Sequence, residues 1–294
     1  VDIPNCIGCR KCEFACQQVA GFDVPPIETF DDKSVFRTHR RPSDTRFTTV
    51  NEFPNPADPG KPLYVKVQCM HCNEPACASA CLVGALRKDE NGAVVYDAWK
   101  CMGCRYCMVA CPFQIPAYEY DNALTPQVRK CNFCFDRIAK EGGVPACVKI
   151  CPRECLIFGR RSELLHVAHE RIDKHPDRYV DHVYGEHEAG GTSWLYLSSV
   201  PFEQLGFLKL SGEAPNRLTE TIQHAIFKGW VPPLALYALL GLVMWLGRTP
   251  DEPEERDGPP RRQPTARTPA RQTGTTRRAE ALAVTLTGCG DRRT

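Results

Sequence analysis

Cysteine content distinguishes this chain from an ordinary soluble protein. The chain has 294 residues, of which 18 are cysteine, about three times an average share. Hydrophobic residues make up 43% and charged residues 24%, which excludes wholesale disorder and a protein with many membrane spans. The 37 basic residues are nearly cancelled by 35 acidic ones, so the net charge of +2 argues against nucleic acid as a partner.

Sixteen of the cysteines fall into four sets of four. The sets are Cys6, Cys9, Cys12 and Cys16; Cys69, Cys72, Cys77 and Cys81; Cys101, Cys104, Cys107 and Cys111; and Cys131, Cys134, Cys147 and Cys151. The first and third sets have the spacing C-x2-C-x2-C-x3-C, by which bacterial ferredoxins bind a 4Fe-4S cluster while the fourth cysteine ligates the other cluster of a pair. The second set opens one gap to four residues and the fourth set opens one to twelve. The spacing predicts sixteen iron ligands.

The first and third sets also match each other outside their cysteines. Residues 5–16 (NCIGCRKCEFAC) and 100–111 (KCMGCRYCMVAC) share glycine, arginine and alanine at matching places, which indicates an internal duplication. Gly8 and Gly103 supply the backbone freedom that three thiolates two residues apart need to curl round one cluster.

Other uses of cysteine fit the spacing less well. Structural zinc sites use separated C-x2-C pairs, typically a dozen or more residues apart, which these runs do not provide. Cysteines two residues apart in long runs would form strained disulfides. Catalytic thiols seldom come in fours, and no Cys-His pair with the spacing of a nucleophile is visible.

The remaining cysteines and one histidine need separate interpretations. Cys155 lies four residues after Cys151, and we expect it to be a buried spectator thiol rather than a ligand. Cys289 lies in a polar tail. His71 lies between two ligands of the second set, and we expect it to act from outside the ligand shell or to face solvent, because histidine ligation belongs mainly to Rieske clusters. Six cations flank the motifs and would tune an anionic cluster: Arg10, Lys11, Lys100, Arg105, Arg129 and Lys130.

The chain outside the motifs divides into an insertion and an extension. Residues 1–160 are expected to form the four-cluster domain, in which 17–68 make an irregular insertion with a short strand at 63–67. Residues 161–228 are expected to form an extension that packs on partner subunits. Within it we expect a strand at 192–200, after two glycines.

The extension is predicted to begin with a helix. Ser162 is expected to cap it. Its apolar face at helical spacing consists of Leu164, Leu165, Val167, Ala168 and Ile172. His166 and His169 are expected to face solvent on this helix.

One apolar segment predicts a membrane helix. Residues 229–247 contain no charge over 19 residues, and Trp230 and Trp245 lie near the two ends, so we predict a transmembrane helix at 229–248, with a buried core helix as the alternative. Residues 249–294 are rich in Pro, Thr, Arg and Gly and are expected to be a disordered tail. Five basic residues flank the span on the C-terminal side and three on the other, which favours a cytoplasmic tail and a periplasmic cluster domain in the cell membrane.

Four ferredoxin motifs in this order resemble the four-cluster electron-transfer subunits of membrane-bound respiratory oxidoreductases. Within that family, residues 183–207 (VYGEHEAGGTSWLYLSSVPFEQLGF) and 221–229 (TIQHAIFKG) look most like the iron-sulfur subunit of hydrogenase-2-type nickel-iron hydrogenases. Formate dehydrogenase beta subunits look similar too, including a GGT turn and a C-terminal span. The resemblance covers roughly residues 2–248.

The resemblance implies an α+β fold of two ferredoxin-like units that hold four 4Fe-4S clusters, followed by one C-terminal transmembrane helix and the disordered tail. It also implies that the first cysteine set pairs with the fourth and the second with the third. The exchange of fourth cysteines then gives the ligand groups Cys6, Cys9, Cys12 and Cys151; Cys131, Cys134, Cys147 and Cys16; Cys69, Cys72, Cys77 and Cys111; and Cys101, Cys104, Cys107 and Cys81.

The expected function is electron transfer without catalysis, since no acid, base or nucleophile shares a motif. The resemblance implies that electrons pass from the small and large subunits of a hydrogenase to an integral membrane quinone-reducing subunit, from the Cys6 cluster through the Cys131 and Cys69 clusters to the Cys101 cluster. It further implies a removed twin-arginine leader and one helix in the lipid bilayer. The alternatives are the beta subunit of a formate dehydrogenase or other molybdenum oxidoreductase, and a zinc-stabilised, membrane-anchored interaction module.

Overall fold

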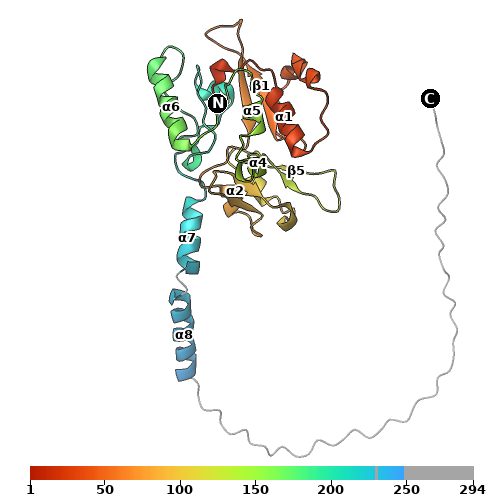
Figure 1. The fold of residues 1–294 in the computed structure, drawn as a ribbon. Coiled ribbons are helices and arrows are strands. Elements are labelled where there is room, and N and C mark those ends of the chain that lie inside the picture. The colour runs from red at the N-terminus through yellow and green to blue at the C-terminus, as the bar shows by residue number, and fades with distance from the viewer. Residues whose placement is uncertain (229–230, 248–294) are drawn as a thin grey trace, which may run out of the picture. The chain divides into compact units, whose positions relative to one another are not determined.

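A computed structural model of the chain describes residues 1–228 and 231–247 (Figure 1). The chain divides into a compact unit, Val1–Tyr237, and a second unit that starts at Ala238. The compact unit mixes short helices with short strands, which confirms the predicted α+β composition.

The regular elements are short, as expected where many cysteine loops interrupt the chain. The α-helices are α1 (Lys11–Ala20), α2 (Ala76–Ser79), α3 (Tyr106–Ala110), α4 (Phe135–Ala139), α5 (Ala146–Lys149), α6 (Arg161–Lys174), α7 (Arg217–Lys228) and α8 (Val231–Leu246). The strands form three antiparallel pairs: β1 (Thr48–Phe53) with β2 (Leu63–Gln68), β3 (Leu86–Lys88) with β4 (Val94–Tyr96), and β5 (Ala117–Tyr118) with β6 (Val128–Arg129). The 3-10 helices are η1 (Ile3–Asn5), η2 (Ile27–Asp31), η3 (Lys33–Arg37), η4 (Ala98–Lys100), η5 (Glu188–Gly190) and η6 (Phe202–Leu205).

The helices of the cysteine motifs pack in nested order. α1 of the first set packs on α5 of the fourth, and α2 of the second set packs on α3 of the third. In Figure 1, α1, β1 and α5 lie in the upper half of the compact unit and α2 and β5 in the lower half. Segments from the two ends of the motif region therefore share one half.

The duplicated motifs have the same backbone conformation. Gly8 and Gly103 have φ values of +67° and +72°, as their predicted role in a tight loop requires. The arginines two residues later, Arg10 and Arg105, are also left-handed, at +56° and +62°, and precede α1 and α3. Non-glycine residues adopt this conformation rarely, so its recurrence supports the duplication.

The main hydrophobic core lies against the β1–β2 hairpin. The hairpin pairs Thr48 with Gln68 at one end and Phe53 with Leu63 at the other, and its second strand confirms the strand predicted at 63–67. Side chains from the C-terminal part of the compact unit complete this core: Tyr184, Trp194, Tyr196, Val200, Phe202 and Leu205. Part of the segment 161–228 is therefore integral to the cluster-bearing body, and its packing on partner subunits stays a prediction.

The prediction of a strand at 192–200 is wrong. This segment makes isolated bridges in turn to three separate partners, at Cys72, Tyr184 and Asp2. A ladder needs two segments that stay together, so successive partners prevent a regular strand.

Helix α6 forms where predicted, but Ser162 does not cap it. The helix begins at Arg161, and the residue at its N-cap position, Arg160, makes no side-chain capping bond. The Arg161 guanidinium instead donates to the carbonyl oxygens of Thr192, Gly185 and Glu186, which fixes the first turn by tertiary contact. The histidines of this helix, His166 and His169, are exposed as predicted.

The described part of the chain contains no helix that is both long enough and apolar enough to cross a membrane. Helix α8 covers 16 residues of the predicted span, and positions 229, 230 and 248 lie outside the described residues. The predicted tail at 249–294, with Cys289, also lies outside them.

Candidate iron-sulfur sites

The first cavity is lined by cysteines from both ends of the motif region. Cys6, Cys9 and Cys12 of the first set and Cys151 of the fourth surround an empty volume of about 420 Å³. These four residues are the ones that the exchange of fourth cysteines groups on one cluster.

The second cavity has the complementary lining. Cys131, Cys134 and Cys147 of the fourth set and Cys16 of the first surround an empty volume of about 450 Å³. Although Cys12 and Cys16 are four residues apart on α1, they face different cavities.

A third group of cysteines lies in the other half of the compact unit. Burial and the nearby charges of Cys69 and Cys111 raise the pKa of Cys72 to about 12. The pKa of Cys77 is raised for the same reasons, again with Cys69 and Cys111 among its neighbours. Cys69, Cys72, Cys77 and Cys111 therefore lie near one another, as the exchange predicts.

The fourth group contains the remaining ligand candidates. Burial, together with the charges of Cys101, Cys81 and Cys104, raises the pKa of Cys107 to about 11. Cys107 and Cys81 belong to the same hydrophobic cluster. Cys104 is exposed, whereas every other cysteine in the described residues is at least half-buried.

Backbone amides point at some of these sulfurs. The Ala85 amide donates to Cys81 Sγ at 3.2 Å, and the Phe133 amide donates to Cys131 Sγ at 3.4 Å. A 4Fe-4S cluster with four thiolates is anionic, and hydrogen bonds to its sulfurs are one of the means by which proteins tune it. The four cysteine groups, the two cavities and these donors fit such clusters.

The donor geometry differs from that of a single-ion site. Among the residues that the structure describes, no three Cys, His, Asp or Glu side chains converge closely enough to hold one metal ion. A cube takes one thiolate at each of its four irons, so its ligands surround a larger object than a tetrahedral zinc ion.

Cys155 is buried, as predicted, but it is not remote from the first cavity. Its Sγ lies 3.3 Å from that of Cys151, and it lines the same cavity. The Cys155 side chain holds the pKa of Cys151 at about 5, with backbone amides near Leu156 and Arg153 adding to the effect and burial opposing it.

His71 is completely buried, which excludes a solvent-facing role. The Val94 amide donates to its Nδ1 at 2.8 Å, and its ring lies 4.8 Å from that of Phe133. Burial and the charges of Lys130 and Lys88 hold the pKa of His71 well below its usual range. The ring is therefore neutral, with Nδ1 as an acceptor.

The six flanking cations are not equivalent. Arg10 is buried, with its guanidinium 3.4 Å from Glu13 and 2.9 Å from the Asp32 carbonyl oxygen. Lys130 is buried and donates to the carbonyl oxygens of Val94 and Cys131. The others are half-buried or exposed: Lys11, Lys100, Arg105 and Arg129.

Sequence reasoning missed a cation that both of the first two cavities share. Lys66 lines both cavities and is 3% exposed. Burial opposes its charge, but Cys147 and Cys12 more than offset this cost, so the pKa of Lys66 lies above its ordinary value. A lysine within a strand ordinarily indicates a solvated face, and no local pattern distinguishes this one.

The fold and the cysteine groups define a ferredoxin-type iron-sulfur protein. Residues 61–161 match a family described as a 4Fe-4S dicluster domain. The cofactors are four 4Fe-4S clusters, for which the sixteen cysteines are the ligand candidates.

Comparison with individual relatives identifies the family more specifically. The chain is 35% identical over 271 residues to the hydrogenase-2 operon protein HybA of Escherichia coli O157:H7, with 83% of the chain and 82% of HybA covered. The chain belongs to the HybA family of iron-sulfur electron-transfer subunits, which are not catalytic subunits.

Two other relatives match over shorter regions. A protein of Nitratidesulfovibrio vulgaris Hildenborough is 52% identical over 205 residues. The match covers 70% of this chain but only 55% of the length of that protein. The iron-sulfur subunit of the nitrate-inducible formate dehydrogenase of Escherichia coli K12 is 34% identical over 208 residues, covering 67% of this chain and 66% of that subunit.

Proposed function

We propose that the chain relays electrons from a nickel-iron hydrogenase catalytic unit, through four 4Fe-4S clusters, to a quinone-reducing membrane subunit. The similarity to HybA along 82% of that protein carries this proposal. The clusters would each take up and release one electron, while the chain supplies ligands, burial and hydrogen bonds that set their potentials.

The ligand assignment is part of the proposal. It consists of the groups Cys6, Cys9, Cys12 and Cys151; Cys16, Cys131, Cys134 and Cys147; Cys69, Cys72, Cys77 and Cys111; and Cys81, Cys101, Cys104 and Cys107. The linings of the two cavities support the first two groups, and the mutual electrostatic effects of the thiols support the other two. Two ferredoxin-like units would then each hold a pair of clusters.

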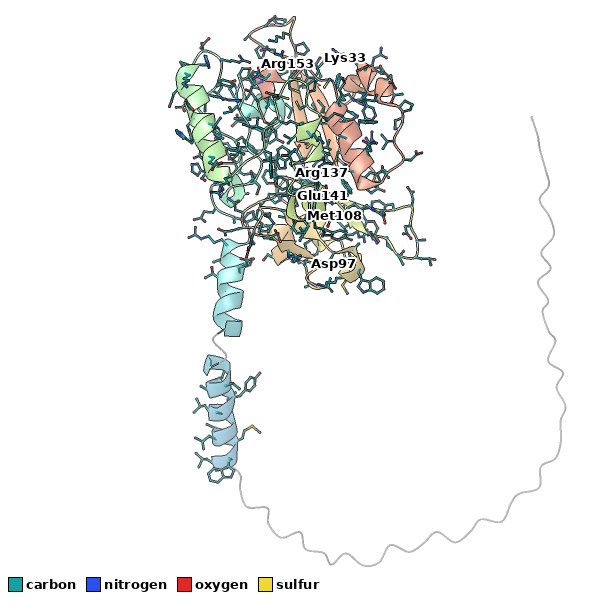
Figure 2. The ribbon with its side chains drawn as sticks, in the orientation of Figure 1. Lys33, Asp97, Met108, Arg137, Glu141 and Arg153 are labelled. Carbon is teal, nitrogen blue, oxygen red and sulfur yellow. The ribbon has the colours of Figure 1, made fainter. Side chains whose placement is uncertain are left out.

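The positions of the end clusters support a linear relay. Arg153 follows Cys151 of the first cluster, and Asp97 precedes Cys101 of the last. In Figure 2 these two labelled residues lie at opposite ends of the part of the molecule that contains the cysteine motifs. We propose that electrons enter at the Cys6 cluster and leave from the Cys101 cluster.

The exit end has an apolar, open surface. Trp99, Met102 and Val109 are 95%, 64% and 81% exposed, and Cys104 is exposed beside them in the sequence. Large exposed apolar side chains are typical of protein interfaces. They support docking of this end on the membrane subunit.

Membrane attachment is a further part of the proposal. From Leu234 to Leu246 in α8, the large apolar side chains are exposed, including Leu236, Leu240, Val243 and Trp245. We propose that residues 229–248 insert in the lipid bilayer and that the cluster domain lies on the periplasmic side. Labelling of Cys289 by a membrane-impermeant thiol reagent from the periplasmic side would overturn this orientation.

A molybdenum-dependent partner is the second candidate, because the chain is also 34% identical to a formate dehydrogenase iron-sulfur subunit. The test is purification of the tagged full chain with its native complex from membranes, followed by metal analysis. The proposal predicts nickel in the complex and no molybdenum above the level from an untagged strain. Molybdenum without nickel would overturn the hydrogenase assignment in favour of the second candidate.

A further inference from the structure

A lysine side chain is buried beside both the first and the second cavity. Lys66 belongs to β2, is 3% exposed, and lines the Cys6 cavity as well as the Cys131 cavity. Each cavity is therefore within reach of the same ammonium group.

The hydrogen-bond acceptors of this ammonium and the ring beside it are neutral. Lys66 Nζ donates to Thr48 Oγ1 at 2.9 Å and to Gln68 Oε1 at 2.8 Å, and it lies 4.5 Å from the centroid of the Trp194 ring. None of the ion pairs found in residues 1–228 and 231–247 includes Lys66. A buried charge without an opposite charge is costly, so neutral partners alone do not explain a lysine here.

The backbone at Lys66 is held in place by a second set of contacts. The Tyr196 hydroxyl donates to the Lys66 carbonyl oxygen at 2.8 Å and accepts from Gln68 Nε2 at 2.6 Å. Gln68 thus binds the ammonium through its oxygen and the tyrosine through its nitrogen. This arrangement fixes the direction of the lysine side chain toward the cavities.

We infer that the Lys66 ammonium is the shared counter-ion of the Cys6 and Cys131 clusters and raises the reduction potential of both. The inference rests on the proposed ligand assignment. Reduction adds one negative charge to a cluster, and a fixed cation in a poorly polarisable interior stabilises that added charge. One lysine therefore makes the two clusters at the proposed entry end easier to reduce.

The test is a potentiometric titration of the full chain, with each cluster followed by electron paramagnetic resonance and its signal assigned through single cysteine variants. In Lys66→Met, the ratio of reduced to oxidised protein at a fixed potential should fall at least tenfold for the Cys6 and Cys131 clusters. For a one-electron couple, tenfold corresponds to about 59 mV. The Cys69 and Cys101 clusters should keep their potentials and serve as the internal control.

Two further variants make the outcome specific to the charge near the clusters. Lys66→Arg keeps the charge and should restore both potentials, and Lys61→Met removes one exposed charge at the same hairpin and should change none. Loss of iron from both neighbouring sites in Lys66→Met, reversed in Lys66→Arg, would support the same role. Unchanged potentials with full iron content, or an equal shift at all four clusters, would overturn the inference.

A chemical reductant drives this titration, so its result does not depend on which catalytic subunit the chain binds. Failure of the counter-ion inference would leave the nickel content of the complex as predicted. Failure of the hydrogenase assignment would leave the potentials of the Lys66 variants as predicted.

Discussion

The Glu13 carboxylate accepts two hydrogen bonds from the Arg40 guanidinium, at 2.6 and 3.0 Å, and a third from the Val50 amide at 2.6 Å. Glu13 is completely buried, and Arg10 lies 3.4 Å from its second oxygen. This carboxylate joins α1, which carries Cys12 and Cys16, to β1 of the insertion.

Replacement of this carboxylate should destabilise the packing of α1 on β1. In Glu13→Gln the two arginines lose their counter-charge in a buried site, which we expect to cost about 3–5 kcal/mol of unfolding free energy. Thermal unfolding of the iron-loaded chain, followed by loss of visible absorbance, should show a lower melting temperature. The exposed Glu28 provides the matched control, and equal melting temperatures for Glu13→Gln and Glu28→Gln would contradict the structural role.

Two glycines allow the effect of backbone strain to be distinguished from the effect of a steric clash. Gly8 and Gly21 both have positive φ values, but a Cβ at Gly8 would lie 2.4 Å from the Tyr64 ring, whereas a Cβ at Gly21 would meet nothing within 4 Å. We expect Gly21→Ala to cost about 1–2 kcal/mol and to keep its iron. Gly8→Ala should lose the Cys6 cluster, about four irons per chain. Equal iron content in the two variants would contradict this reason for glycine at position 8.

The adjacent thiols of Cys151 and Cys155 have different predicted roles. Only Cys151 has the spacing of the ferredoxin pattern, so Cys151→Ala should lose about four irons and Cys155→Ala none. Measurement of iron and acid-labile sulfide in both variants checks this. A comparable loss in Cys155→Ala would make Cys155 a ligand instead.

We expect His71 to stabilise the fold through its acceptor nitrogen, Nδ1. In His71→Leu the buried Val94 amide loses its partner, which we expect to lower stability by about 1–3 kcal/mol. The exposed His166 gives the control variant His166→Leu, whose melting temperature should stay near that of the wild type. If both variants melt at the same temperature, the buried hydrogen bond contributes nothing measurable.

Much of the structure could be predicted from the cysteine spacing, because the spacing is a local pattern with a geometric cause. It predicted the tight loops at Gly8 and Gly103, and the exchange rule assigned Cys12 and Cys16 to different clusters. The pairing of the first set with the fourth came from the resemblance to four-cluster subunits. The structure brings both sets of partners together around separate cavities. The ligand groups themselves stay a prediction until iron is measured at each.

What the sequence could not predict depends on contacts distant along the chain. Alternation along LYVKVQ places Lys66 with Tyr64 and Gln68 on one face of the strand, which indicates exposure to solvent. Trp194 contacts Lys66 and Tyr196 contacts Gln68 on that face, and no local sequence pattern predicts these contacts. The same distant pairing explains why residues 192–200 rich in strand formers make bridges to three partners instead of a regular strand.

The order of the relay is tested most directly by the variant Cys104→Ser in the assembled membrane complex. Cys104 is an exposed ligand candidate of the proposed last cluster. Hydrogen should still reduce the Cys6 cluster, detected by electron paramagnetic resonance, while hydrogen-dependent quinone reduction is lost because only the final step is damaged. Equal loss of reduction at all four clusters, in a complex shown to assemble normally, would contradict this relay.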